Sequence, residues 1–194
     1  MDYIDKIKEI DNYIKNNLTN KRYIHSVNVA NMASDIALKF GLNTNAAYLA
    51  GLSHDIAREF TKDELFKGMN KCFGFSDDFC SNISLFHGPV GALFIQNRFN
   101  IIDKDILDAV SFHTVGGANI SALAKVVYIA DYISADREHV TTDYRNNIKS
   151  CNSLNLMLYK VSSNYRDFLL NTDNKVMPES EEMYNMLLRI LNEE

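Results

Sequence analysis

The sequence predicts an all-α protein built as a single domain, and three features of the chain favour this fold class. The 194 residues are 46% hydrophobic and 23% charged, which suits one packed core and argues against disordered or fibrous proteins. Only 2 prolines and 8 glycines are present, too few for a sandwich or barrel of short strands. Apolar residues recur at intervals of three and four, the period of amphipathic helices. We therefore expect one helical domain over residues 1–194.

The first four helices are predicted from apolar periodicity and from signals at their ends. Residues 2–17 and 20–40 each carry an apolar stripe, and Gly41 is a suitable stop just past the second stripe. A segment rich in Ala and Leu predicts a third helix over 44–58. Residues 61–64 read Thr-Lys-Asp-Glu, which matches a capping box, so a fourth helix is expected to begin there.

The middle of the chain alternates between a loop and short helices. Two glycines and two phenylalanines in residues 70–76 indicate a loop that leads into a short helix near 77–85. Pro89 favours a helix start, because proline in the first turn loses no helical hydrogen bond, and this helix should end near Phe99. Asp103 is a suitable cap for a following helix that ends at about residue 112.

The last part of the chain begins with a break at the glycine pair 116–117. Asn119 or Ser121 can cap a long apolar helix that runs through Ser134. Two further helices are expected near residues 151–170 and 178–192. No strand, internal repeat or low-complexity tract is predicted.

Charge and composition exclude several classes of function. The net charge of −5 lacks the basic excess by which proteins bind phosphate backbones, so nucleic acid is not an expected partner. The chain opens without a secretory signal and has no window approaching about 18 apolar residues, so we expect a cytoplasmic protein without a membrane span. Cys72, Cys80 and Cys151 lack zinc-finger spacing and are expected to be buried or partly buried free thiols.

Histidine and aspartate stand at positions where their burial needs a partner. His54 and Asp55 are adjacent within the apolar segment 50–57, where two polar side chains are costly to bury. Imidazole and carboxylate are both ligands of divalent transition metals, so a bound ion would offset that cost. Asp131 lies in a segment that is apolar on nearly every side, and it too would need a cation. His25 shares the core-facing stripe of the second predicted helix.

Each of these residues, taken alone, also has an ordinary structural interpretation. A core histidine can bond to a backbone carbonyl, and a buried aspartate can cap a neighbouring helix. The ordered set of His25, His54 with Asp55, and Asp131 on apolar helices favours a metal site over four unrelated roles.

The set resembles the HD superfamily of metal-dependent phosphohydrolases, whose pattern is a histidine, a His-Asp doublet and a distant aspartate. Within that superfamily four strings resemble the bacterial symmetrical bis(5′-nucleosyl)-tetraphosphatases, also called diadenosine tetraphosphate hydrolases. These strings are Leu52-Ser53-His54-Asp55-Ile56-Ala57, His87-Gly88-Pro89-Val90-Gly91-Ala92, His113-Thr114 and Ala130-Asp131-Tyr132-Ile133. The resemblance implies a single HD-domain helical bundle, with a motif-bearing core over about 18–140 and helices over about 151–192 packed on it.

The same resemblance implies an activity and a cofactor. The implied reaction is the cleavage of diadenosine tetraphosphate into two ADP by a metal-activated hydroxide, with iron as the expected ion. The implied metal ligands are His25, His54, Asp55 and Asp131. Such an ion provides positive charge and a hydroxide at neutral pH, so no nucleophilic side chain is needed. The number of bound ions, one or two, stays open. The oligomeric state, a monomer or a homodimer, stays open as well.

Further residues are expected to contact the phosphates. His87 and His113 match two extra histidines that either complete a second metal position or contact the phosphates. Arg58, expected on the same helix face as His54, and Arg137, expected beyond a helix end, can supply guanidinium groups. Thr114 offers a hydroxyl and an amide. The catalytic candidates are Asp55, His87 and His113. The metal ligands His25 and Asp131 are also expected to contact the nucleotide.

Other interpretations share most of these features. Another HD phosphohydrolase, acting on a nucleotide monophosphate or a cyclic or alarmone nucleotide, would have the same metal ligands. A non-catalytic nucleotide sensor would keep the fold and is expected to depart from a primary ligand, which this chain does not. His139 is expected to be exposed and without a role, and the polar segment 171–178 to be a solvated loop or a nucleoside contact.

Overall fold

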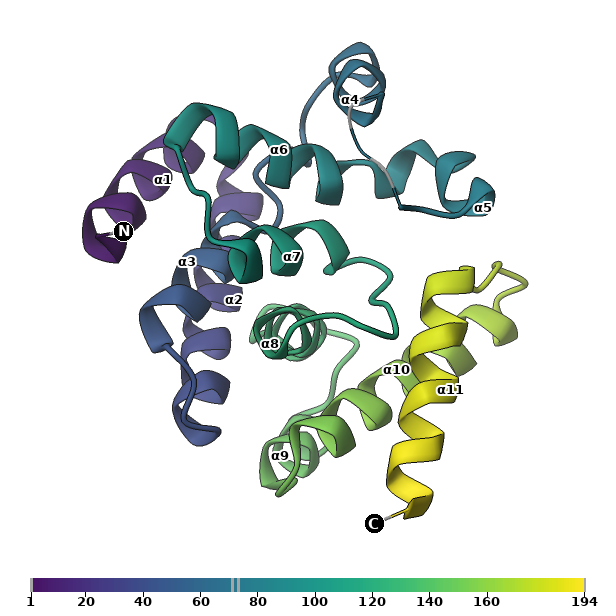
Figure 1. Ribbon diagram of the computed structural model, residues 1–194. Coiled ribbons are helices and arrows are strands. Elements are labelled where there is room, and N and C mark those ends of the chain that lie inside the picture. Colours follow the sequence, from purple (N-terminus) through teal and green to yellow (C-terminus); the bar gives the residue numbers. More distant parts are fainter. Residues whose placement is uncertain (1, 71, 73, 194) are drawn as a thin grey trace.

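The structure is a computed structural model that describes residues 2–70, 72 and 74–193. Over these ranges the chain is helical and contains no strand, so the all-α prediction is confirmed (Figure 1). The elements are α1 (Tyr3–Asn17), α2 (Asn20–Lys39), α3 (Thr44–Ser53), α4 (Lys62–Met69), α5 (Asp77–Cys80), the 3-10 helix η1 (Ile83–Leu85), α6 (His87–Phe99), α7 (Lys104–Phe112), α8 (Ala122–Ile133), α9 (Thr142–Ser150), α10 (Leu154–Asn171) and α11 (Pro178–Glu193). No helix in these ranges has both the length and the apolar character needed to cross a membrane.

Several helix starts form as their capping residues predict. Thr61 and Glu64 make the reciprocal capping box at the start of α4. The side chain of Asp103 accepts a hydrogen bond from the first turn of α7. Ser121, rather than Asn119, caps α8 through the backbone N–H of Ala124. These side chains satisfy N–H groups that have no partner within their own helix.

The third helix ends earlier than its apolar pattern predicts. Residues 54–58 were expected to be helical, but α3 ends at Ser53 and the chain continues as turns. Successive hydrogen bonds between residues three apart replace the helical ladder, including Arg58 N–H to the Asp55 carbonyl at 2.9 Å. Consequently the His-Asp doublet lies on a tight turn that follows the helix, and the expected helix face shared by His54 and Arg58 does not exist.

Two other segments differ from the prediction. The expected short helix near 77–85 is divided into α5 and η1, because Asn82 caps a new 3-10 turn through the backbone N–H of Ser84. In the preceding loop over 70–76, residues 71 and 73 lie outside the described part of the chain. Cys80 is exposed rather than buried, because α5 is a four-residue helix at the surface.

Helix α9 was not predicted. Its nine residues are strongly polar and only Ile148 is buried, so no apolar stripe marks it. Thr141 caps its first turn through the backbone N–H of Tyr144. The helix packs against α10 and follows directly on the loop after α8.

Helix α8 lies at the centre of the arrangement, with α2 and α3 on one side, α7 on another and α10 with α11 beyond it (Figure 1). The main apolar core forms where these helices meet, and α8 contributes Val126, Val127 and Ile129, all without exposed area. Helices α2 and α3 pack closely against each other. A Cβ atom at Gly51 would lie 2.8 Å from Cα of Ala30, so the two backbones touch and only glycine fits. This contact brings the end of α3 beside the first half of α2.

Candidate metal and phosphate site

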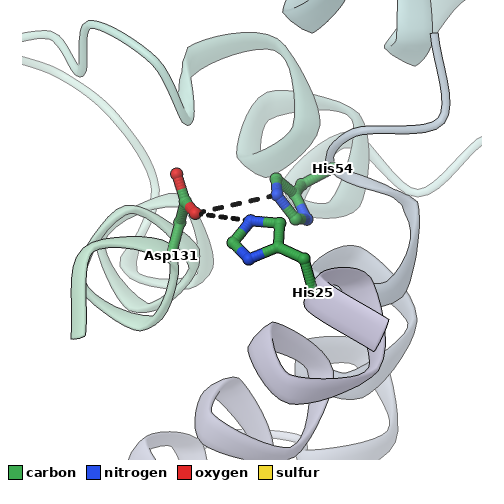
Figure 2. Close-up of side chains that lie close together, drawn as sticks. All are labelled: His25, His54 and Asp131. Atoms are coloured by element: carbon green, nitrogen blue, oxygen red, sulfur yellow. Dashed lines mark ion pairs between the residues drawn. The ribbon is translucent and has the colours of Figure 1, made fainter. Parts of the chain in front are cut away.

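Three elements that are distant in the sequence bring His25, His54 and Asp131 together. His25 extends from α2, His54 from the turn after α3, and Asp131 from α8, and their side chains point toward one another (Figure 2). Oδ1 of Asp131 lies 2.9 Å from Nε2 of His25 and 3.9 Å from Nε2 of His54. Both histidines are buried. Contacts of α2 with α3 and with α8 therefore position all three side chains.

Backbone carbonyls fix the ring orientation of three of the four clustered histidines. Nδ1 of His54 donates a hydrogen bond of 2.7 Å to the carbonyl three residues earlier, and His87 and His113 make the same bond at 2.8 Å. A carbonyl only accepts, so each Nδ1 carries the hydrogen and each Nε2 presents a lone pair. The local chain geometry of each residue thus directs an unprotonated Nε2 into the cluster.

The unsatisfied polar atoms of the cluster fit a divalent cation. Nε2 of His25 and Nε2 of His54 are buried and make no hydrogen bond with any described residue. Nε2 of His25 is 2.9 Å from Oδ1 of Asp131, but the angles between the two groups do not fit a hydrogen bond. One ligand atom from each of His25, His54 and Asp131 lies within 4.8 Å of the others. Imidazole nitrogen and carboxylate oxygen are the donors that first-row transition metals bind.

Asp55 links this group to a second one. Its Oδ2 lies 3.7 Å from Nε2 of His54 and 3.1 Å from Nη1 of Arg22. Its Oδ1 lies 3.2 Å from Nε2 of His87 and 3.7 Å from Nε2 of His113. His54, Asp55 and His113 also have ligand atoms within 4.8 Å of one another. The carboxylate of Asp55 therefore faces both groups of histidines.

The imidazoles of His87 and His113 face each other through the same ring atom. Their Nε2 atoms are 3.1 Å apart, and both Nδ1 atoms are already occupied as donors to carbonyls. Two lone pairs at this distance repel unless a proton or a cation lies between them. Both rings are buried, so water screens the repulsion poorly.

Electrostatics keeps the acids ionised and His54 neutral. Burial raises the pKa of Asp55, but contacts with three histidines outweigh it and hold this pKa well below its ordinary value. The same balance lowers the pKa of Asp131, where His25, His54 and Arg137 oppose burial. Burial lowers the pKa of His54 to about 4, so its imidazole is uncharged at neutral pH. Metal ligands need these protonation states.

A cavity of about 670 Å³ opens beside the cluster. Its walls include the candidate residues Asp55, Arg58, His87, His113, Thr114, Asp131 and Arg137. His25 and His54 do not line the cavity and lie beneath its floor. The segment 171–178, considered as a nucleoside contact, does not line the cavity either. The volume is in the range of small-molecule sites.

The cationic and hydroxyl candidates lie at different points on the cavity wall. Arg137 folds back from the loop after α8, and its Nη2 pairs with Oδ1 of Asp131. Arg58 donates through Nη1 to the carbonyl of Ser84 at 3.1 Å, next to His87. The hydroxyl of Thr114 is buried without a hydrogen-bond partner among the described residues. Arg58 and Arg137 give the cavity two guanidinium groups, whereas the oxygen of the Thr114 hydroxyl is buried in its wall.

Sequence reasoning did not select several residues at this site. Arg22 lines the cavity one turn before His25 on α2, a spacing that could have found it. His139 is exposed, as expected, but it also lines the cavity. Asp136 contacts His25 at 2.7 Å and belongs to an irregular loop, where no periodic pattern signals its position. The cavity also has an aromatic wall formed by Tyr132, Tyr165 and Phe168.

Comparison with known proteins gives a consistent picture. The HD domain family model matches residues 22–136. A symmetrical bis(5′-nucleosyl)-tetraphosphatase of Bacillus subtilis (strain 168) is 34% identical over 90% of this chain and 94% of its own length. The protein of the same name in Staphylococcus aureus is 28% identical over 97% of this chain and 93% of its own length.

A solved structure supports the same assignment. The crystal structure of a protein from Clostridium acetobutylicum, described as a predicted HD superfamily hydrolase involved in NAD metabolism, has a TM-score of 0.85 and 31% identity. The similarity covers 94% of this chain and 97% of that protein. The matched region contains His25, the His54-Asp55 doublet and Asp131, whose side chains meet beside the cavity. The chain belongs to the HD-domain family and is a hydrolase related to the diadenosine tetraphosphate hydrolases.

Proposed function

We propose that the chain hydrolyses diadenosine tetraphosphate symmetrically into two ADP with a bound transition metal, iron being the expected ion. The observation that carries this proposal is the pair of unsatisfied Nε2 atoms on His25 and His54, which face Asp131 beneath a cavity lined by three arginines. The names of the Bacillus and Staphylococcus relatives favour a dinucleoside tetraphosphate over nucleotide monophosphates or cyclic nucleotides. Residues 1–194 are proposed to act as one HD domain.

The proposed metal ligands are His25, His54, Asp55 and Asp131. Such an ion supplies positive charge and lowers the pKa of a bound water to near neutrality. Asp55 is buried and ionised and faces both histidine groups, so its two oxygens present negative charge in two directions. The mixed set of imidazoles and carboxylates suits iron and its neighbours, and it lacks the thiolates typical of structural zinc.

Side chains around the cavity are proposed to bind the polyphosphate. Arg58 and Arg137 carry guanidinium groups that can each donate two hydrogen bonds to phosphate oxygens. Thr114 adds a free hydroxyl. Since the Nε2 atoms of His87 and His113 need a proton or cation between them, this pair can hold a proton and donate it to the departing ADP. A second metal ion between them and Asp55 is the alternative.

Product analysis of the protein purified without oxygen tests the proposal. Metal content is measured on the same preparation that is incubated with diadenosine tetraphosphate, and early products are separated by chromatography. We expect at least one transition metal per chain and ADP as the sole early product. AMP together with ATP would refute symmetric cleavage. Turnover of nucleoside monophosphates or cyclic nucleotides in preference to the dinucleotide would favour another HD phosphohydrolase.

A further inference from the structure

His25 is anchored differently from the other three clustered histidines. Each of those histidines donates Nδ1–H to a backbone carbonyl three residues earlier. His25 lies inside the regular helix α2, where backbone carbonyls already accept helical hydrogen bonds. Its Nδ1 is instead 2.7 Å from Oδ2 of Asp136, in the loop between α8 and α9. A carboxylate from a distant segment thus takes the place of a local carbonyl.

We infer that Asp136 is a positioning residue, which fixes His25 as a metal ligand by accepting the hydrogen bond of Nδ1–H. The inference rests on the proposed metal site. A hydrogen on Nδ1 leaves the lone pair on Nε2, the atom that faces Asp131 and makes no hydrogen bond with the part of the chain that the structure describes. A carboxylate acceptor also makes the imidazole a stronger ligand than a carbonyl does, because negative charge increases the electron density of the ring.

Asp136 is itself fixed at its other oxygen. Nδ2 of Asn28, one turn after His25 on α2, donates to Oδ1 of Asp136 at 3.1 Å. One carboxylate therefore joins two side chains on the same face of α2, and its orientation is set by α2 as well as by its own loop.

The loop that carries Asp136 is fastened by Arg145 of α9. Nε of Arg145 donates to the carbonyl of Ile133 at 2.7 Å, and Nη2 donates to the carbonyl of Ser134 at 3.0 Å. A further contact of Nη2 reaches the carbonyl of Val140 at 3.4 Å, beyond Asp136. A single guanidinium thus binds the loop before and after Asp136, which gives α9 a part in placing the ligand His25.

Substitution of Asp136 tests the inference through metal affinity. Co²⁺ is titrated into the metal-free protein and binding is followed by its visible absorption. We expect Asp136→Ala to weaken Co²⁺ binding by about 10- to 100-fold, the range typical for partners of metal ligands. Asp136→Asn keeps an acceptor oxygen without the charge and should lose less. Asn28→Ala leaves Asp136 in place but frees one oxygen, and we expect an intermediate loss.

Glu138→Gln is the matched control. Glu138 is two residues further along the same loop, is exposed, and belongs to no ion pair among the described residues. The substitution removes the same charge near the site without touching His25. We expect Co²⁺ affinity within about twofold of the parent, since a change of 0.4 kcal/mol corresponds to roughly that factor.

Nuclear magnetic resonance of the imidazole nitrogens gives a readout that a general loss of structure would not produce. In the diamagnetic Zn²⁺ form of the parent we expect an Nδ1–H signal from His25, protected from exchange by Asp136. In Asp136→Ala this signal should broaden or disappear, while those of His54, His87 and His113 remain because their carbonyl acceptors are unchanged.

The two proposals fail in different ways. A parent protein that binds neither Co²⁺ nor Zn²⁺ would overturn the metal site, and this inference with it. A parent that binds the ion, with Asp136→Ala no weaker than Glu138→Gln, would overturn the role of Asp136 alone. Loss of all four histidine signals together would mean that the substitution unfolds the site, which would also contradict a specific bond to His25.

Discussion

The carboxylate of Asp55 lies close to the Nε2 atoms of three histidines and to the guanidinium group of Arg22. Its removal therefore tests the site at the scale of a single residue. We expect Asp55→Ala to lower metal affinity and turnover by more than about 100-fold, because loss of a ligand should exceed the loss typical of its outer partners. Metal content per chain and turnover of the dinucleotide are the two measurements. Full metal occupancy with normal turnover would remove Asp55 from the site.

A control at Asp35 separates this effect from the loss of any aspartate. Asp35 is exposed on α2 and belongs to no ion pair among the described residues. We expect Asp35→Ala to keep parental metal content and turnover. Treating the parent with a chelator should reproduce the phenotype of Asp55→Ala.

His87 and His113 distinguish a second metal ion from a phosphate contact. If the pair shares a proton and touches phosphate, His113→Ala should keep the parental metal content while ADP binds more weakly and turnover falls by about 10²–10⁴-fold, the usual contribution of a general acid. If the pair binds a second ion, metal content should fall, and added divalent metal should restore activity. Unchanged metal content, ADP affinity and rate in both His87→Ala and His113→Ala would exclude either role.

At the scale of helices, the contact of α2 with α3 positions the proposed ligands His25 and His54 relative to each other. Gly51→Ala would place a Cβ atom 2.8 Å from Cα of Ala30, and backbone atoms cannot move aside as a side chain can. We expect a loss of about 1–3 kcal/mol in the free energy of unfolding and weaker metal binding, because His25 and His54 move apart. Chemical denaturation of the metal-free protein, followed by Co²⁺ titration, measures both effects.

Gly91 of α6 provides the matched substitution. A Cβ atom there would lie 3.4 Å from Cγ2 of Ile56, an ordinary contact with a side chain. Alanine is the better helix former by up to about 1 kcal/mol, so Gly91→Ala should keep or raise stability and leave metal binding unchanged. A comparable loss in both variants would mean that the close helix contact is not the cause.

Elements with capping side chains or sustained apolar stripes were predictable from the sequence, and those defined by long-range contacts were not. Thr61 with Glu64, Asp103 and Ser121 gave correct helix starts because a cap depends on residues three or fewer positions away. The apolar residues after Ser53 favoured a longer α3, but hydrogen bonds between residues three apart replace the helical pattern there. Helix α9 has one buried residue, so its sequence carries no stripe.

In the candidate site too, some residues could be predicted from the sequence and others depend on contacts between distant segments. Buried acids and histidines in apolar helices, such as Asp131 and His25, attract attention in the sequence because their burial needs a partner. Asp136 is partly exposed in a loop and is ordinary by composition, and its contact with His25 depends on how the α8–α9 loop folds over α2. Roles of this kind become visible only in three dimensions.

For the whole molecule, bound metal is expected to contribute to stability. An ion that binds only the folded chain stabilises it by about 2.7 kcal/mol when present at 100 times its dissociation constant. For a protein of this size each kcal/mol corresponds to about 2–4 °C, so a chelator should lower the melting temperature by roughly 5–11 °C. Differential scanning fluorimetry with and without chelator measures the shift. An equal shift in Asp55→Ala would show that the chelator acts on something other than the site.

The spread of the proposed ligands along the chain has an expected consequence for the lifetime of the protein. His25 and Asp131 come from α2 and α8, and His54 from the turn after α3, so an ion bound among them would act as a cross-link between three distant segments of the chain. The segments cannot separate until the ion dissociates, and global unfolding becomes no faster than that step. Proteases that cleave unfolded chains would then remove the metal-free form first. If the proposed ion binds there, we expect metal supply to affect the lifetime of each molecule as well as its rate of turnover.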